Sequence, residues 1–359
     1  MLSISDRCLL EDLTLLSENT CIPWNRLSRK AVLVTGASGF IGSLLIKAIL
    51  FSCEKKEIPV TVLGLARDID KAAELYRDFS SLQCATLKLI SGDITRAITL
   101  PSKIDFILHT ASPTGSGFFV SHPVETAQAI VCGTDAILRL AYENAVEGMV
   151  YLSSMEVFGS LDSDEPADEE TLGVIRLHVP RSCYPEGKRM AECLCAAYSS
   201  EYGVPVRIAR LAQTFGAGVL PTEKRVFAQF ARSVLQKKNI VLHTSGLSEG
   251  NYCYSRDAVA AILLLLFSGQ SGEAYTVVNE ASHTTIRAMA EMLAHEVAGD
   301  QIRVTYEIPR EPNTYGYAPD VRLNLSSTKL RSLGWQPEVS LKESYIRMIQ
   351  SIRDQEALV

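Results

Sequence analysis

A glycine-rich turn between a strand-like run and a helix-like run constrains this chain of 359 residues more than any other feature. The β-branched run Ala31–Thr35 comes first, and Gly36, Gly39 and Gly42 follow it. Gly36 permits a tight turn out of the strand, Gly39 lets the backbone approach a pyrophosphate, and Gly42 lets the helix pack close to the sheet. N–H groups at the start of the helix then favour an anion. The turn therefore predicts a site for a dinucleotide cofactor.

Short apolar runs alternate with helical patterns along the first two thirds of the chain. The runs that predict strands cover 31–35, 60–65, 85–90, 106–109, 149–153 and 206–211, and the helical patterns cover 43–51, 72–79, 123–146, 186–202 and 224–237. Strands that alternate with helices form βαβ units and a parallel sheet. We therefore predict an α/β fold, a Rossmann-type doubly wound parallel sheet with a smaller C-terminal substrate-binding lobe.

The texture of the sequence divides the chain into three parts. Leucines at near-helical spacing predict an N-terminal helical extension over residues 1–29. Residues 30–212 are predicted to form an NAD(P)-binding Rossmann domain, and 213–359 mainly a substrate-binding lobe that is interleaved with the last sheet strands. The acidic stretch 162–170 is predicted to be a solvated loop, and 309–319, rich in proline, glycine and tyrosine, a loop of the lobe.

Charge and cysteine usage exclude several classes of partner. The net charge of −6 argues against nucleic acid and anionic membranes, which attract basic proteins. The most apolar run, Ala258–Phe267, is about half as long as a membrane span requires, and the first thirty residues lack the pattern of a signal peptide. Nine cysteines without a CxxC pair or a Cys/His cluster predict reduced thiols, no metal site and a cytoplasmic location.

Residues after the second and third predicted strands bear on which nicotinamide cofactor binds. An acid at the end of the second strand meets the ribose of NAD, and a base meets the 2′-phosphate of NADP. Arg67 can meet a 2′-phosphate, whereas Asp68 comes one residue late for the ribose; alternatively, the two form a surface ion pair. Asp93, after the next strand, is expected beside the adenine. The sequence thus predicts NAD or NADP without choosing between them.

Tyr184 and Lys188 are the first candidates for catalysis. They lie four residues apart in a predicted helix, so that their side chains share one face. A lysine ammonium beside a phenol favours the phenolate and lowers the pKa of the tyrosine, which suits a base that removes a proton from a sugar hydroxyl. Ser154, at the end of a predicted strand, is expected to bridge the same hydroxyl.

Together these residues resemble the extended short-chain dehydrogenase/reductase family, in its nucleotide-sugar epimerase/dehydratase branch. The motifs that carry the resemblance are Thr35-Gly-x-x-Gly-x-x-Gly42, His109-Thr-Ala-Ser-Pro113, Ser154-x-Glu156-Val-Phe-Gly159, Tyr184-x-x-x-Lys188 and Leu333-Gly-Trp-Gln-Pro337. The stretch 180–192 looks most like UDP-glucuronate decarboxylases. The resemblance implies a homodimer paired through helices 123–146 and 184–202. It also implies a tightly held nicotinamide cofactor, bound by Gly36, Ser38, Gly39, Phe40, Ile41, Gly42, Arg67, Asp93, Ile94, Ala111, Tyr184 and Lys188.

The resemblance also implies a chemistry. Tyr184 would deprotonate the C4 hydroxyl of a nucleotide sugar while C4 gives hydride to the cofactor, with Ser154 polarising the oxygen. Glu156 matches the carboxylate of 4,6-dehydratases and decarboxylases, which can remove the acidified C5 proton of a 4-keto sugar. Met155 replaces the acid of glucose dehydratases, and methionine donates no proton. The expected function is C4 oxidation followed by Glu-assisted loss of water or carbon dioxide.

Two alternatives remain beside this function. A nucleotide-sugar 4-epimerase or an NADPH-dependent 4-keto-sugar reductase is favoured by Arg67 and Met155. A remote alternative is a non-catalytic NAD(P)-binding protein, because fold does not fix function.

The expected substrate contacts lie in the C-terminal part. The resemblance assigns substrate binding to Ser154, Gln213, Arg225 and Arg322, and arginine suits a diphosphate because it binds phosphate with two parallel hydrogen bonds. Gly250, however, stands where the family carries an arginine, and Gln213 replaces a usual asparagine. A diphosphate-binding group has therefore been lost, or Arg256 or another residue supplies it.

Overall fold

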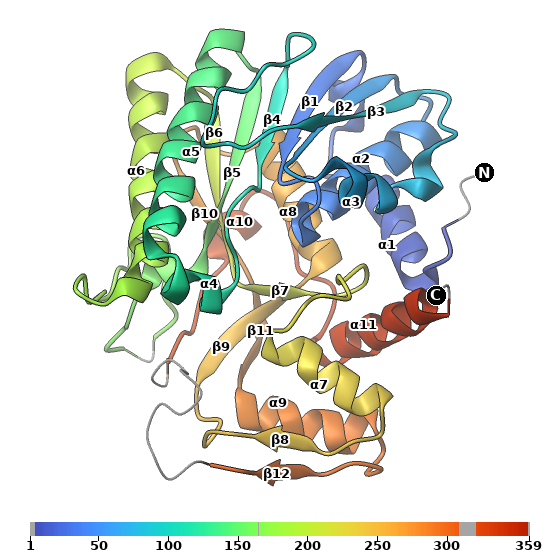
Figure 1. Cartoon of the computed structure of the whole chain (residues 1–359), viewed down its shortest axis with the longest axis vertical. Helices are drawn as coiled ribbons and strands as arrows, with labels where there is room; N and C mark the ends of the chain where they lie inside the picture. Colours follow the sequence, from blue (N-terminus) through green and yellow to red (C-terminus); the bar gives the residue numbers. More distant parts are fainter. Residues whose placement is uncertain (1–3, 164, 309–320, 358–359) are drawn as a thin grey trace.

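A seven-stranded sheet forms the centre of the molecule, and every neighbouring pair of its strands is parallel (Figure 1). The computed structural model describes residues 4–163, 165–308 and 321–357, so the predicted loop 309–319 lies outside the described residues. Across the sheet the strands are β10 (Ala274–Val277), β6 (Val206–Leu211), β5 (Gly148–Ser154), β4 (Phe106–His109), β1 (Lys30–Thr35), β2 (Val60–Ala66) and β3 (Ala85–Ser91). The six predicted strands are confirmed, and so is the predicted Rossmann-type sheet.

Helices cover both faces of this sheet. Two cores result, one beneath α2 (Phe40–Lys55) and α8 (Ser255–Phe267), the other beneath α5 (Pro123–Asn144) and α6 (Cys183–Tyr202). The strands are apolar on both sides because both sides are buried, which explains their continuous hydrophobic runs. The parallel order brings the carboxyl ends of the strands to one edge, where α/β proteins bind ligands.

One predicted helix is wrong. Residues 72–79 do not form one helix, because α3 (Ile69–Glu74) ends early and a separate 3₁₀ turn, η2 (Arg77–Phe79), follows it. The chain turns there to bury Phe79 and Tyr76, and the Tyr76 hydroxyl donates a hydrogen bond to the carbonyl oxygen of Ala37. Burial of two aromatic rings overrides the helical periodicity.

Two smaller sheets lie at the carboxyl edge of the central sheet (Figure 1). We call them, with the helices that pack on them, the small-sheet region. Its strands are β7 (Gln213–Phe215), β9 (Glu249–Tyr254) and β11 (Asn279–Thr285) in one sheet and β8 (Ile240–Leu242) and β12 (Val304–Tyr306) in the other, and its helices are α7 (Val226–Leu235), α9 (Ile286–Met292) and α11 (Leu341–Glu356). Helix α7 confirms the helix predicted over 224–237. Between β9 and β11 the chain returns to the central sheet to form α8 and β10.

The predicted N-terminal helix is α1 (Arg7–Glu18), which begins at the N-cap Asp6. Leu9, Leu13 and Leu16 form its buried face, as their spacing predicts. Helix α1 lies against α2 and α8 on one side and against the C-terminal α11 on the other (Figure 1). The first and last helices of the chain are therefore neighbours.

The acidic stretch 162–170 is only partly the solvated loop that its composition predicts. Glu169 is buried, and its carboxylate accepts a hydrogen bond from the backbone N–H of Thr276 in β10 over 2.6 Å. The Arg210 guanidinium donates to the carbonyl oxygen of Glu169 over 2.7 Å. The loop is thus attached to the edge of the central sheet.

Neither a membrane-spanning helix nor a cluster of metal ligands is found in the part of the chain that the structure describes. None of its helices is long and apolar enough to cross a bilayer. No group of three or more His, Cys, Asp or Glu side chains there is arranged to hold a metal ion.

Candidate active site

The glycine turn joins β1 to α2 in the geometry that the motif requires. Gly36 has φ of +70°, and a Cβ atom on Gly42 would lie 2.3 Å from the carbonyl oxygen of Gly36. Both positions therefore exclude a side chain. Gly39 is the N-cap of α2 and provides no side chain to accept from the first N–H groups of the helix. Ser38, Phe40 and Ile41 lie in the same turn, and its free N–H groups suit a phosphate.

The ends of β2 and β3 bring Arg67 and Asp93 into electrostatic contact. Hydrogen bonds from Thr95 lower the pKa of Asp93, and the positive charge of Arg67 lowers it too. Asp68 caps α3 by accepting from the N–H of Lys71 over 3.0 Å. The carboxylate of Asp68 therefore serves to cap a helix. Arg67 is exposed at this edge of the sheet. Ile94 is buried against the position of Gly133 in α5.

His109 connects the ends of β1 and β4. Its Nδ1 lies 2.8 Å from the Thr35 hydroxyl oxygen, which also accepts from the N–H of Ala111 over 3.1 Å. Burial lowers the pKa of His109 to about 3, with help from the charge of Lys188. A neutral, hydrogen-bonded histidine serves to hold the two strand ends, so the His109 motif positions Ala111 beside the glycine turn.

Tyr184 lies in the first turn of α6, and its ring packs against Phe119 of α4 (Ser116–Ser121). The two rings are stacked with centroids 4.2 Å apart and an angle of 11° between their planes. Lys188 is buried on the same helix face and donates from Nζ to the carbonyl oxygen of Leu152 over 2.7 Å. Its Nζ lies 5.9 Å from the centre of the Tyr184 ring. Ser154 ends β5; its hydroxyl accepts from the N–H of Glu156 over 3.2 Å, and it lowers the pKa of Tyr184.

The expected lowering of the Tyr184 pKa does not occur among the protein's own groups. Burial, and less strongly the charge of Glu156, raise the pKa of Tyr184 to about 12, although Ser154, Arg225 and Arg181 act to lower it. Burial also lowers the pKa of Lys188 to about 7, so the ammonium charge is itself weakened. The prediction from spacing was wrong because it placed both groups on one face without accounting for their desolvation.

Glu156 forms an ion pair that the sequence did not predict. It lies in the 3₁₀ turn η3 (Met155–Phe158), and Arg181 of η4 (Pro180–Ser182) contacts both of its carboxylate oxygens over 2.7 and 2.9 Å. The pair is partly buried, and the Arg181 guanidinium also lies 5.7 Å from the centre of the Phe119 ring. Arg181 stands three residues before Tyr184, a helical spacing that could have indicated a shared face.

The four expected substrate contacts differ in their surroundings. Ser154 is beside Tyr184, and the charge of Arg225 also reaches that phenol. Arg225 precedes α7 and is ion-paired with Glu223 over 2.6 Å. Gln213 in β7 has a buried side-chain oxygen without a hydrogen-bond partner among the described residues. Arg322 is exposed at a bridge to Glu249 of β9.

The surroundings of Gly250 and Arg256 show whether Arg256 can replace the family arginine that is missing at position 250. A Cβ atom at Gly250 would meet none of the described residues within 4 Å. Arg256 does not replace that arginine, because its guanidinium is paired with Asp12, Asp257 and Glu338 at 3.7, 3.6 and 2.8 Å. The suggestion that Arg256 supplies the diphosphate contact is therefore wrong.

Known proteins resemble this chain along most of its length. A dTDP-D-glucose 4,6-dehydratase of Mus musculus is 28% identical over 337 residues, which cover 90% of this chain and 89% of the relative. The UDP-glucuronic acid decarboxylase 1 of Danio rerio is 30% identical over 324 residues, covering 90% of this chain and 72% of that protein. Among solved structures, a dTDP-glucose 4,6-dehydratase from Streptomyces venezuelae with NAD bound has a TM-score of 0.71 at 23% identity, and covers 91% of this chain and 98% of its own.

The family itself follows from a match to a family model over more than half of the chain. The model of the NAD dependent epimerase/dehydratase family matches residues 32–279, which include the glycine turn, the Tyr184 cluster and the strands that carry them. The relatives are named enzymes, and the solved structure shares the seven-stranded fold. This chain therefore belongs to the NAD-dependent epimerase/dehydratase family of enzymes.

Proposed function

We propose that this enzyme holds NAD or NADP at the β1–α2 turn and oxidises a nucleotide sugar at C4. The residues fit the cofactor, because Gly36 and Gly42 exclude side chains from the turn and α2 begins with free N–H groups. Arg67, Asp93, Ile94 and Ala111 border the same edge of the sheet. The observation that carries the proposal is the convergence of Tyr184, Ser154 and Lys188 at the carboxyl end of β5, in the same parallel sheet whose β1 leads into this turn.

Tyr184 is proposed as the base that takes the C4 hydroxyl proton, with Ser154 donating to the same oxygen. The bound nicotinamide supplies the hydride acceptor and a positive charge. That charge is needed, because the protein alone raises the pKa of Tyr184 to about 12. The Leu152 carbonyl already holds Lys188 in place, so Lys188 can take part in the site without moving.

The Glu156–Arg181 ion pair favours decarboxylation over dehydration as the second step. Dehydration requires a base to take the C5 proton, but both carboxylate oxygens of Glu156 already accept hydrogen bonds from Arg181, so taking that proton would require one of these bonds to break. Loss of carbon dioxide from a C5 carboxylate leaves its electron pair on C5, next to the C4 carbonyl, and needs no such base. A proton from solvent would then have to reach C5 to restore the C4 ketone. C4 would take back the hydride while Tyr184 gives its proton back to the C4 oxygen, so that the cofactor would be regenerated. Decarboxylation of a nucleotide-activated uronic acid is our preferred reaction.

A reductase is the second candidate. Arg67 is exposed at the end of β2, where a 2′-phosphate of NADP would lie. An NADPH-dependent 4-keto-sugar reductase consumes its cofactor at each turnover, whereas a decarboxylase, dehydratase or epimerase returns the hydride. Cofactor consumption therefore separates the two candidates.

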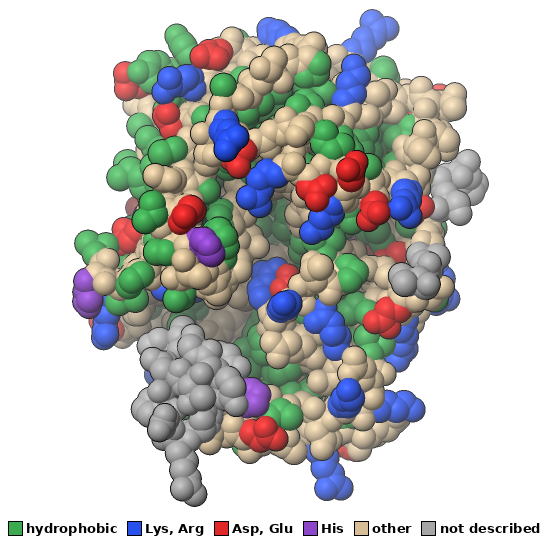
Figure 2. Space-filling view, viewed as in Figure 1, with side chains coloured by type: hydrophobic (Ala, Val, Ile, Leu, Met, Phe, Trp, Pro, Cys, Tyr) green, Lys and Arg blue, Asp and Glu red, His purple; other side chains and the backbone are tan. Residues whose placement is uncertain are grey.

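We further propose a homodimer in the cytoplasm. Helices α5 and α6 lie side by side at one edge of the molecule (Figure 1), and hydrophobic side chains are exposed along that edge (Figure 2). They include Val124, Tyr142, Met190 and Tyr202. A second copy would cover them. All nine cysteines are free thiols, which supports a reducing compartment. Replacement of Met190 by Asp should yield monomers in light scattering; an unchanged mass would contradict this interface.

Mass spectrometry tests the reaction. The purified protein is examined under native conditions for a co-purified nicotinamide cofactor, and then incubated with UDP- and dTDP-sugars that include UDP-glucuronate. A product lighter by carbon dioxide, without net consumption of cofactor, is expected. Loss of water instead would select dehydration, an isomer of unchanged mass an epimerase, and a gain of two hydrogens with NADPH the reductase. Each of these would replace the preferred reaction.

A further inference from the structure

Two acidic side chains of α1 point into the protein rather than into solvent. Asp6, the N-cap of α1, is 5% exposed and Asp12, within the helix, is 3% exposed, although none of the predicted cofactor or substrate contacts lies in α1. Asp12 accepts from the Tyr254 hydroxyl over 2.6 Å and from Arg347 of α11 over 2.9 Å. Asp6 accepts from the hydroxyl of Ser351, also in α11. Burial of a carboxylate costs free energy unless hydrogen bonds and opposite charges compensate for it, so the question is what these two side chains hold in place.

The two hydroxyls that reach these acids also hold two consecutive backbone amides. The N–H of Ala217 donates to the Tyr254 hydroxyl over 3.4 Å, and the N–H of Gly218 donates to the Ser351 hydroxyl over 2.9 Å. Each amide is thus connected through one hydroxyl to one carboxylate of α1. Residues 216–218, which we call the crossover segment, lead from β7 toward α7.

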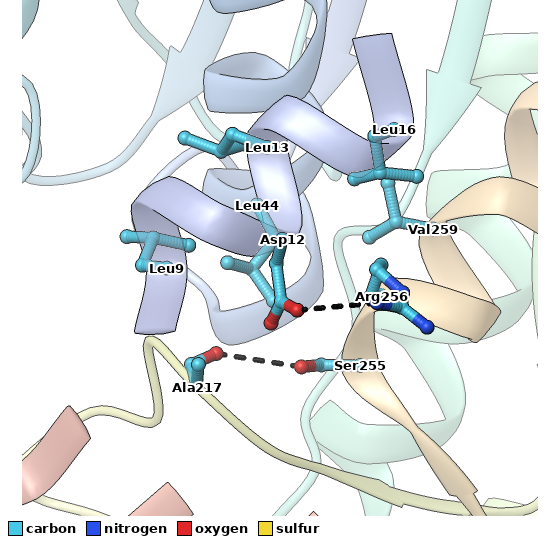
Figure 3. A pocket seen from close by; sticks show the side chains of 9 residues that line it. All are labelled: Leu9, Asp12, Leu13, Leu16, Leu44, Ala217, Ser255, Arg256 and Val259. Carbon is cyan, nitrogen blue, oxygen red and sulfur yellow. Dashed lines mark hydrogen bonds and ion pairs between the residues drawn. The ribbon is translucent and has the colours of Figure 1, made fainter. Parts of the chain in front are cut away.

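The crossover segment depends on such partners. Gly216 and Ala217 are buried, and a buried amide needs a hydrogen bond. Gly218 has φ of +78°, and a Cβ atom there would lie 2.9 Å from Leu44 of α2, so the segment carries no side chain that could anchor it at this point. The close-up in Figure 3 shows Asp12 opposite Arg256, with Ser255 and Ala217 joined by a hydrogen bond below α1.

The segment leads directly to a predicted substrate contact. Seven residues after Gly218 comes Arg225, which Glu223 holds by an ion pair and whose charge reaches the Tyr184 phenol. A shift of the crossover segment therefore moves Arg225 relative to Tyr184. Misplacement of a binding group by about 1 Å is enough to impair turnover.

We propose that α1 positions the substrate site: Asp6 and Asp12, through Ser351 and Tyr254, fix the Ala217 and Gly218 amides and so fix where Arg225 stands. This inference rests on the proposed substrate role of Arg225. Asp6, Asp12, Tyr254 and Ser351 are positioning residues, because none of them belongs to the Tyr184 cluster.

The test removes the two hydroxyls and leaves both carboxylates in place. In the full chain, Tyr254→Phe combined with Ser351→Ala should speed amide hydrogen exchange in residues 216–220 by about tenfold. The affinity for UDP or dTDP, whichever wild type binds more tightly in calorimetry, should fall by about tenfold, while the affinity for NAD stays at the wild-type value. If the double variant does not fold, Ser351→Ala alone gives the same readouts for Gly218.

A matched control comes from the same helix. Glu18→Gln removes an exposed ion pair between α1 and Lys55 of α2, at 2.9 Å, without touching the crossover segment. It should leave both exchange and nucleotide affinity unchanged. Wild-type exchange in the double variant would overturn the proposal, as would faster exchange with unchanged nucleotide affinity, or an equal loss of NAD affinity.

The proposed function can fail separately. If Arg225→Gln binds the nucleotide as tightly as wild type does, Arg225 is no substrate contact, and the assignment of that residue is wrong. Faster exchange in the double variant would then still show that Tyr254 and Ser351 hold the crossover segment, but the positioning of a substrate group would be refuted.

Discussion

Two clusters in this enzyme combine a buried tyrosine, a carboxylate and an arginine, yet they are connected differently. The Tyr254 hydroxyl makes three hydrogen bonds, to Asp12, to Arg347 and to the Ala217 amide. In the other cluster, Glu156 and Arg181 bind each other, and Ser154 acts on Tyr184 only by lowering its pKa. A structural tyrosine has its hydrogen-bonding capacity filled by the protein, whereas a reactive one keeps capacity for a substrate.

The two clusters also differ in the charge of the basic side chain beside the tyrosine. Burial lowers the pKa of Lys188 to about 7, which weakens its charge beside Tyr184. Burial also acts against the charge of Arg347, but Asp12 and Tyr254 more than compensate and raise its pKa. Burial still raises the pKa of Asp12 despite Tyr254, Arg347 and Arg256, but its arginine keeps a full charge, whereas the lysine beside Tyr184 does not. The following experiments test that difference.

The largest effect is expected from the two tyrosines themselves. Tyr184→Phe should lower kcat at least about 1,000-fold, because it removes the acid–base hydroxyl, while NAD binding in calorimetry is retained. Tyr254→Phe should keep the wild-type kcat at saturating substrate. Wild-type turnover in Tyr184→Phe would refute the catalytic assignment, and a loss of kcat in both variants would erase the distinction between the clusters.

Glu156→Gln separates the two possible second steps. The preferred decarboxylation needs no base at C5, so product formation should stay near the wild-type rate. If water is lost instead, C4 oxidation should proceed while product formation falls about 100-fold, because the amide carries no charge and cannot take the C5 proton. Reduced cofactor should then accumulate, visible by its absorbance. Glu186→Gln is the control, because Glu186 is also paired with an arginine next to this site, at 3.3 Å from Arg189. A large loss of product in Glu156→Gln would contradict decarboxylation as the second step.

Gln213→Leu tests whether the buried side-chain oxygen of Gln213 binds the substrate. If the buried oxygen of Gln213 binds the nucleotide sugar, its loss should raise KM about tenfold without lowering the melting temperature. Thr276→Val removes another buried hydroxyl that lacks a partner among the described residues, in β10, and should leave KM unchanged. An unchanged KM in Gln213→Leu would show that the orphan oxygen has no role in binding.

The smallest effect concerns stability and pH. The folded-state pKa of Lys188, about 7, lies below its ordinary value of 10.5, so between these values the unfolded chain binds more protons. The free energy of unfolding of the ligand-free protein should therefore rise with pH, relative to Lys188→Met, by about 1 kcal/mol per unit between pH 7 and 8.5. Urea titrations at several pH values measure it. Parallel curves for both proteins would show that Lys188 is not desolvated as described.

The features that could be predicted are local ones. The glycine turn, the six strands and the shared helix face of Tyr184 and Lys188 follow from backbone sterics and from periodicities of two or 3.6 residues, which any short stretch displays. The leucine face of α1 was found in the same way. Where local pattern competed with burial, as at Tyr76 and Phe79, burial prevailed and the predicted helix was broken.

Other features depended on residues that are distant in sequence. Glu156 meets Arg181 across 25 positions, and Asp12 meets Tyr254 across 242. The pKa of Tyr184 was predicted with the wrong sign, because burial depends on the packing of α4 and α6 and not on the spacing to Lys188. Desolvation and long-range ion pairs arise only when the chain is packed, and no local pattern encodes them. The amino-acid order thus specified the sheet, the cofactor turn and the tyrosine–lysine pair, while packing determined which charges meet and which hydroxyl is left for chemistry.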